Sequence, residues 1–404
     1  MSTDPHAASA SRILNVRIVT PDRVIPLGTV TLRDGRIGSV RSQREAAAPR
    51  AGGDFDARGG TLMPGFIDMH FHGALGHDTM DLDADSWRAI CGFLLRHGVT
   101  GFLPTASAAD AAGIAAYLKL AGEIMAESPA GARVLGVHLE GPYLNPVFRG
   151  MHPMTHCRPP DPAEYTPWLA AGVVRRMTAS LEVGGAERLL ADCARAGVLL
   201  SLGHTACLAN DVRRWADLGL RHATHLYNAM SRAEKQGPVR VCGCVEGVLT
   251  ARPVAAEIIG DGNHVPECLF RIAATCKGAD GVTIGSDSTL FTGAVREGVP
   301  MRYGGSTQEV VVRNGRATSP DGSALIGSVA PLGAMLPRVV GWLDGDLLAA
   351  ARMFSTNAAR LMGLGERKGR IAQGCDADLV LLDEHLQVGA TWVGGVRCFL
   401  QARE

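Results

Sequence analysis

The feature that most constrains the fold of this chain is a repeated alternation of short apolar runs with helical patterns. Runs rich in Val, Ile and Leu recur about eight times, and helical spacing of apolar residues separates them. This alternation favours parallel strands connected by helices, and eight units suggest an α/β fold with a closed TIM-like (β/α)8 barrel. The candidate strands cover residues 62–70, 98–105, 133–140, 173–180, 197–204, 220–227, 254–261 and 281–287.

One connecting helix is predicted after Asp85, because an aspartate can cap a helix N-terminus. Apolar residues then recur at helical spacing from Trp87 to Leu95, and Gly98 ends the pattern. We expect this apolar stripe to pack on the barrel.

The two ends of the chain show a different texture, with short strands separated by turns such as Asp34-Gly35. The chain has 404 residues, more than the roughly 250 to 300 at which a single core usually stops growing. We therefore predict two domains. Residues 1–60 and 363–404 form a small β-sandwich domain, and residues 61–362 form the barrel.

Charge and hydropathy exclude several function classes. The 40 basic and 40 acidic side chains balance, so the sum of charges gives no general attraction to nucleic acid or to anionic membranes. No apolar stretch reaches the roughly 18 residues of a membrane-spanning helix. The N-terminal residues lack the pattern of a secretory signal, and the ten cysteines contain no Cys-x-x-Cys pair. We expect a cytoplasmic protein with reduced thiols.

Several candidate strands end in a side chain that can bind a metal or transfer a proton. In a barrel these ends converge on one face, where active sites are built. His70 and His72 lie two residues apart in an extended segment, so both imidazoles project to one side and can hold one ion. Alone, His-x-His is equally compatible with a polar loop.

The ends of three neighbouring strands strengthen the prediction of a metal site. Glu140, His204 and His225 would supply one oxygen and two nitrogen ligands, a set typical of catalytic zinc or iron with a position left for water. None of the four lysines ends a predicted strand, so Glu140 is the candidate bridging ligand. Asp287 ends the last strand and could be a further ligand or the base that takes a proton from the attacking water.

Other chemistries leave no sequence signature. There is no Gly-x-Ser-x-Gly nucleophile elbow and no Gly-x-x-x-x-Gly-Lys-Ser/Thr phosphate loop. For each strand-end residue taken singly, a hydrogen-bonded structural role is an alternative. Taken together, their number favours a metal-dependent hydrolase.

The motifs themselves resemble a known family. They are PGFIDMHFHG (64–73), HLEGPYLNP (138–146), GHT (203–205), THLYNAM (224–230), GDGNH (260–264) and GSD (285–287). From about residue 12 to its end the chain resembles the N-acetylglucosamine-6-phosphate deacetylases of the amidohydrolase superfamily. The resemblance implies that Glu140, His204 and His225 hold the main divalent metal and that Asp287 is the catalytic acid-base. Since His70 and His72 are present, it also allows a second ion.

The resemblance further implies a set of substrate contacts. His264 would lie near the scissile amide, Asn228 and Ala229 would contact the polar end of the sugar, and His152 would contact the phosphate end. The family is also expected to form a homodimer in which a segment of the partner completes the substrate pocket.

That segment departs from the family pattern. Where the family has an arginine for the phosphate, eleven residues after His225, this chain has Gln236, with Lys235 beside it. An unphosphorylated N-acyl amino sugar, or another amide such as an N-acyl amino acid, is therefore an alternative substrate. A non-catalytic metal-binding barrel is a further alternative, against which Asp287 argues, because a structural metal needs no free base.

Overall fold

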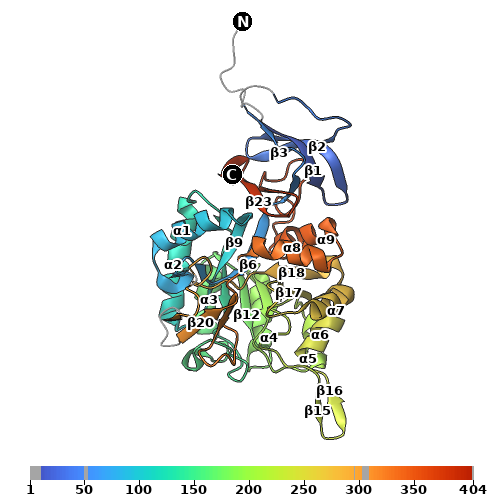
Figure 1. The fold of residues 1–404 in the computed structure, drawn as a ribbon. Coiled ribbons are helices and arrows are strands. Elements are labelled where there is room, and N and C mark those ends of the chain that lie inside the picture. The colour runs from blue at the N-terminus through green and yellow to red at the C-terminus, as the bar shows by residue number, and fades with distance from the viewer. Residues whose placement is uncertain (1–10, 50–52, 295, 303–308, 403–404) are drawn as a thin grey trace.

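A computed structural model describes residues 11–49, 53–294, 296–302 and 309–402. Its centre is a sheet of parallel strands arranged as a barrel, with helices on the outside (Figure 1). From the first barrel strand to the last, each strand pairs with the next: β6 Phe66–Phe71, β9 Val99–Ala106, β11 Val137–Glu140, β12 Val174–Ala179, β13 Leu199–Leu202, β14 His222–Ala223, β17 Ala255–Ile259 and β18 Val282–Gly285. Short β10 (Arg133–Val134) also pairs with β9. All eight predicted barrel strands are confirmed.

The last barrel strand, β18, is joined to the first, β6, by hydrogen bonds of both side chains and backbone. Asp68 Oδ1 accepts the backbone N–H of Ser286 at 3.2 Å, and the N–H of Asp287 donates to the carbonyl of His70 at 2.9 Å. Burial raises the pKa of Asp68 to about 6. These bonds fix the register in which Asp287 faces the His-x-His strand.

The outer helices bury one apolar face each against the barrel. They are α1 Ala84–Leu95, α2 Ala111–Glu127, α3 Pro162–Ala170, α4 Ala186–Arg195, α5 Ala209–Asp217, α6 Cys244–Thr250, α7 Glu267–Lys277, α8 Leu332–Trp342, α9 Leu347–Ala351 and α10 Asn357–Leu361, the last two joined by a π turn, Arg352–Thr356.

The predicted cap of α1 is wrong by two residues. Asp83, not Asp85, accepts the first free N–H groups, those of Asp85 and Ser86, while Asp85 lies within the helix and pairs with Arg88.

Both chain ends build the small β domain, which confirms the predicted fold class. Its strands form one hydrogen-bonded path in the order β24 Val396–Leu400, β23 Val388–Val393, β22 Leu379–Leu382, β5 Thr61–Pro64, β1 Ser11–Val19, β2 Val24–Arg33 and β3 Arg36–Ser42, with β4 Asp54–Asp56 beside β1. The domain has its own apolar core, which includes Ile13, Leu379 and Trp392.

Three small sheets are separate from the barrel sheet and from the sheet of the small β domain. The hairpin of β15 (Glu234–Gln236) and β16 (Val239–Val241) projects from the body of the molecule (Figure 1). The second sheet contains β19 Pro300–Arg302, β20 Glu309–Arg313 and β21 Arg316–Thr318, and the third contains β7 Gly73–Ala74 and β8 His77–Asp78. Short 3-10 turns cover Thr79–Asp81, Met154–His156 and Ala279–Gly281. No described helix is long and apolar enough to cross a membrane.

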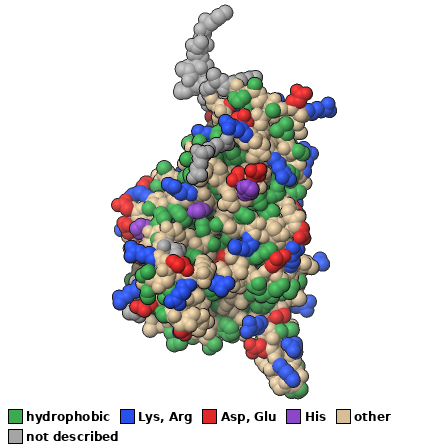
Figure 2. Space-filling model, viewed as in Figure 1, with side chains coloured by type: hydrophobic (Ala, Val, Ile, Leu, Met, Phe, Trp, Pro, Cys, Tyr) green, Lys and Arg blue, Asp and Glu red, His purple; other side chains and the backbone are tan. Residues whose placement is uncertain are grey.

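The surface of the molecule carries charges of both signs. In the space-filling view, basic and acidic side chains alternate over the barrel and the small β domain, and neither sign forms a continuous face on the side shown (Figure 2). This distribution agrees with the balance of charges in the sequence.

A glycine at the junction of the two domains gives a stability test. A Cβ at Gly65, between β5 and β6, would lie 2.3 Å from the Thr100 side chain, whereas a Cβ at Gly92 in α1 would meet no atom within 4 Å. We expect Gly65→Ala to lower the free energy of unfolding by about 1 to 3 kcal/mol. The control, Gly92→Ala, should raise it by roughly 0.5 to 1 kcal/mol. Urea denaturation measures both, and equal stability of the two variants would contradict this packing.

Candidate active site

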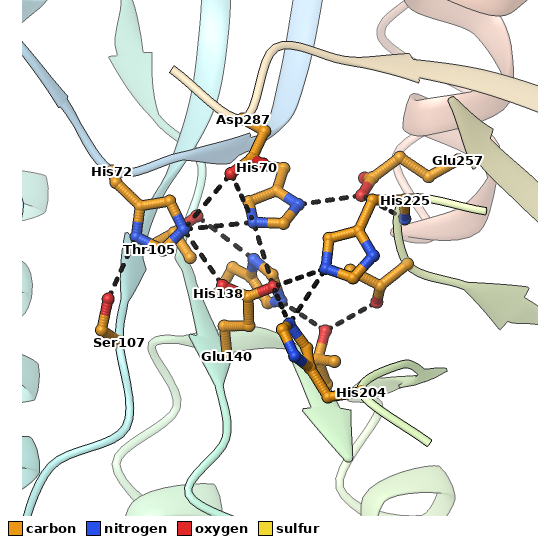
Figure 3. A network of polar contacts seen from close by, with 12 residues as sticks. His70, His72, Thr105, Ser107, His138, Glu140, His204, His225, Glu257 and Asp287 are labelled. Carbon is orange, nitrogen blue, oxygen red and sulfur yellow. Dashed lines mark hydrogen bonds and ion pairs between the residues drawn. The ribbon is translucent and has the colours of Figure 1, made fainter. Parts of the chain in front are cut away.

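The predicted metal ligands and Asp287 converge at the carboxyl ends of the barrel strands (Figure 3). Glu140 is the last residue of β11, while His204, His225 and Asp287 follow β13, β14 and β18 by two residues each. The φ angles of these last three are +50°, +31° and +49°, in the left-handed region that residues other than glycine rarely adopt. The chain turns sharply at each strand end, and this turn directs the side chain over the barrel mouth.

The Glu140 carboxylate lies at the centre of the cluster. Its Oε1 lies 3.3 Å from the Nε2 atom of His70 and 3.2 Å from the Nε2 atoms of both His204 and His225. Its Oε2 lies 3.0 Å from Nε2 of His72. The carboxylate therefore faces two pairs of histidines, His204 with His225 and His70 with His72, and we call each pair a half-site. A ligand that bridges two ions has to face both half-sites.

The donor set fits a divalent cation. The Nε2 atoms of His204 and His225 are 3.0 Å apart, and those of His70 and His72 are 3.2 Å apart. Zinc–nitrogen bonds of about 2.0 to 2.1 Å would place neighbouring ligand atoms of a tetrahedron roughly 3.3 Å apart, close to these separations. Imidazole nitrogens that face each other in a buried site are best satisfied by a shared cation.

The electrostatics of the cluster also favour binding of a cation. Burial opposes the charged form of Glu140, but the surrounding histidines outweigh it and hold its pKa well below the usual range. Burial also opposes a charge on His70, yet the carboxylates of Glu140, Asp287 and Glu257 raise its pKa well above the usual value. The site thus concentrates negative charge in a dry environment, which favours binding of a cation.

His152 joins this cluster in a different role. Its Nδ1 accepts the backbone N–H of Ala108 at 3.1 Å, so its Nε2 carries the proton and donates to Glu140 Oε2 at 3.3 Å. Burial lowers the pKa of His152 to about 4, so it is neutral. Although His152 is close enough to Glu140 and His204 to be grouped with them as a ligand, its proton makes it a donor. The structure places His152 beside the Glu140 carboxylate, and its contact with the phosphate end, which the resemblance implies, stays a prediction.

Asp287 is placed for proton transfer. Its Oδ1 lies 3.4 Å from His70 Nε2 and 3.6 Å from His72 Nε2, and its side chain is 14% exposed. It is more exposed than Glu140 or Glu257 and lines the cavity above the cluster. From this position it can contact both the cation ligands and a water in the cavity.

The cavity has a volume of about 820 Å³. His264 lines it and is oriented by Asp261, whose Oδ2 lies 2.8 Å from His264 Nδ1. Burial opposes a charge on this imidazole, but the hydrogen bond to Asp261 outweighs it and raises the pKa of His264. Asn228 and Ala229 line the same cavity. Among the described residues of its wall there is no lysine or arginine.

Lys235 and Gln236 do not line this cavity. Both are exposed on the projecting hairpin. Because successive side chains of a strand point to opposite faces, Lys235 and Gln236 lie on different sides of β15. Lys235 therefore does not occupy the position of an arginine at residue 236.

Sequence reasoning missed two buried charged residues next to the cluster, Arg176 of β12 and Glu257 of β17. A signal for them was present, since each is a charge within a predicted buried strand. It also missed the apolar cavity wall, formed by Met80, Phe148, Met151, Leu325 and Ile326. Met80 lies in a short 3-10 turn and the other four lie in loops, and nothing in the sequence of these segments indicates that they form a common wall.

The barrel and its histidine–carboxylate cluster define a hydrolase with a divalent-metal centre. The sequence matches the amidohydrolase family over residues 61–398. It is 31% identical over 400 residues to an N-acetylglucosamine-6-phosphate deacetylase of Bacillus subtilis (strain 168), covering 97% of this chain and 98% of the relative. The bovine protein of the same name is 32% identical over 84% of each chain.

A solved structure shows the same fold. The crystal structure of N-acetylglucosamine-6-phosphate deacetylase from Thermotoga maritima superimposes with a TM-score of 0.84 at 29% identity, covering 96% of this chain and 100% of that one. The chain belongs to the amidohydrolase family, and these relatives, which are named N-acetylglucosamine-6-phosphate deacetylase, are similar to it over most of its length.

The geometry predicts how metal content responds to loss of a ligand. Because Glu140 faces both half-sites, Glu140→Gln should lose both ions at metal concentrations that saturate the wild type, and His225→Ala should lose the main ion. The double variant His70→Asn/His72→Asn should keep about one ion per chain. Elemental analysis of purified protein measures each content. His156→Asn, at the cavity wall, serves as the control, and an unchanged metal content in Glu140→Gln would refute this ligand set.

Proposed function

We propose that this chain hydrolyses the N-acetyl group of N-acetylglucosamine 6-phosphate, with one or two divalent ions, zinc or iron, in the cluster around Glu140. The products would be glucosamine 6-phosphate and acetate. The observation that carries this proposal is the convergence of Glu140, four histidines and the more exposed Asp287 in one cluster that borders a single cavity. The names of the relatives support the choice of substrate.

Glu140, His204 and His225 would hold the main ion, and His70 with His72 a second. A divalent ion in this cluster supplies Lewis-acid polarisation of the amide carbonyl and lowers the pKa of a water towards about 7. In this mechanism Asp287 accepts the proton of the attacking water and later returns it to the departing amine nitrogen. His264, which Asp261 orients and whose pKa Asp261 raises, would contact the substrate near the scissile amide.

We also propose a homodimer in the cytoplasm. The projecting hairpin supports the dimer, since it carries Lys235 and Gln236 away from this chain's own cavity and presents them to a second copy. The cysteines form no disulfide bonds in this structure, and several of them, such as Cys91 and Cys193, are buried. Reduced thiols of this kind are typical of cytoplasmic proteins.

One observation favours a second candidate substrate, the unphosphorylated N-acetyl amino sugar. The described wall of the cavity offers no lysine or arginine, and Gln236 provides only neutral donors where the family has an arginine. A phosphate would then meet fewer charged partners than in the relatives.

The proton-transfer role predicts the behaviour of Asp287→Asn. An amide cannot accept the proton of water, so we expect kcat to fall by about 10² to 10⁴-fold, while the ions stay bound because Glu140 and the histidines remain. Acetate release and elemental analysis on the same sample measure the two effects. Near-normal turnover in this variant would remove Asp287 from the mechanism.

Gln236 on the hairpin predicts a weaker preference for the 6-phosphate than an arginine at this position would give. A hydrogen bond to a charged group contributes about 1.5 to 3 kcal/mol, so Gln236→Arg should raise the preference for the 6-phosphate in kcat/KM by roughly 10- to 100-fold. Lys235→Arg places the same group on the other face of the strand and should leave the ratio unchanged. The assay compares both sugars as substrates. If the wild type already prefers the phosphate by more than about 10⁴-fold, this account of the phosphate end is wrong.

The oligomeric state is tested separately. Light scattering at micromolar concentration should give the mass of two chains. A monomer with full activity would show that no partner segment is needed.

A further inference from the structure

A buried ion pair adjoins the ligand cluster, and neither of its members is a ligand. Glu257 lies within β17 and Arg176 within β12, and their side chains are 1% and 0% exposed. The guanidinium contacts both oxygens of the carboxylate. Figure 3 shows Glu257 beside His70 and His225, on the side of the cluster away from Glu140. Isolated charges in such an interior are costly, so the location of this pair calls for an explanation.

Glu257 contacts both half-sites through one oxygen. Its Oε1 lies 2.9 Å from Nδ1 of His70 and accepts the backbone N–H of His225 at 3.2 Å. Because an ionised carboxylate only accepts hydrogen bonds, Nδ1 of His70 must carry a proton. The lone pair of Nε2 is then available on the side of Glu140 and His72, where a cation would bind.

Arg176 anchors the same arrangement. It keeps Glu257 ionised, and it donates to the carbonyl of Met69 and to the hydroxyl of Thr224, each at 3.0 Å. Met69 and Thr224 directly precede the ligands His70 and His225. The ion pair is therefore bonded to two of the three strand ends that present histidines to the cluster, those that carry His70 and His225.

A glycine on the neighbouring strand leaves space for the Glu257 carboxylate. A Cβ at residue 285, on the neighbouring strand β18, would lie 2.9 Å from Cδ of Glu257. Gly285 thus allows Glu257 to occupy its place against β18, the strand that leads to Asp287.

We propose that Glu257, held by Arg176, is a positioning residue that fixes His70 with a protonated Nδ1 and so makes the His70–His72 half-site able to bind a second cation. This inference rests on the proposed function, because it concerns the same metal centre. Outer carboxylates of this kind typically change metal affinity by 10- to 100-fold. If the pair served only to fill the barrel, any variant that folds would keep both ions.

The variant Glu257→Gln separates these roles. A glutamine has one acceptor oxygen, which Arg176 would attract, and the amide NH₂ would then face Nδ1 of His70. Nδ1 would have to accept, the proton would move to Nε2, and the ligand would be lost. The matched control is Thr283→Val. Thr283 is also buried in the barrel, 3.2 Å from His222 Nε2, and contacts none of the proposed ligands.

The experiment titrates metal-free full-length protein with Zn²⁺ in competition with a chromophoric chelator. Wild type and Thr283→Val should bind two ions per chain. Glu257→Gln should bind the first ion with little change and the second about 10- to 100-fold more weakly, with a circular dichroism spectrum like that of the wild type. Two ions held at wild-type affinity by folded Glu257→Gln, or a single ion in the saturated wild type, would overturn the proposal.

A second measurement needs no variant at Glu257, so it applies even if Glu257→Gln does not fold. In ¹⁵N-histidine-labelled wild-type protein, the nitrogen shifts of His70, assigned with His70→Asn, should show a protonated Nδ1 with and without Zn²⁺. An unprotonated Nδ1 would contradict the proposal. Failure of the proposed function is distinguishable, because it would appear as normal binding of two ions without release of acetate from N-acetylglucosamine or its 6-phosphate.

Discussion

A single buried carboxylate organises the active site. Glu140 is almost fully shielded from water, and imidazole nitrogens of five histidines lie within 3.3 Å of its two oxygens. A negative charge in such a place is costly unless cations or donors compensate it. His152 meets this need as a neutral donor, while the other four histidines leave nitrogens that a divalent cation would share. The left-handed turns at His204 and His225 are the local strain that brings these groups together.

The polar interior extends from the cluster into the barrel. Behind His70, the Nε2 of His138 lies 2.7 Å from the hydroxyl of Thr178, which continues through Thr224 and Ser201 to His222. Burial lowers the pKa of His222 to about 3 and that of His138 well below its usual value. Both histidines therefore act as neutral hydrogen-bonding groups. Apolar packing between strands and helices supports this polar interior from outside.

Much of this architecture could be predicted from the sequence, because it depends on local patterns. The alternation of strands and helices indicated the barrel, and strand ends indicated the ligands, since parallel strands bring their carboxyl ends to one face. The cap of α1 was misplaced because Asp83 and Asp85 have the same chemistry and only the backbone geometry distinguishes them. The position of His152 depends on its bond to Ala108, a contact between loops that no spacing encodes. Arg176 and Glu257 are far apart in sequence, so their pairing follows only from the closure of the barrel.

The central claim is that Glu140 bridges divalent ions between two groups of histidines. The most direct measurement is a crystal structure of the active, zinc-loaded enzyme with anomalous diffraction data collected at the zinc edge. The account predicts anomalous density between Glu140, His204 and His225, and a second peak between Glu140, His70 and His72. An enzyme that releases acetate while Glu140 contacts only histidines, with no anomalous density beside it, would contradict the account.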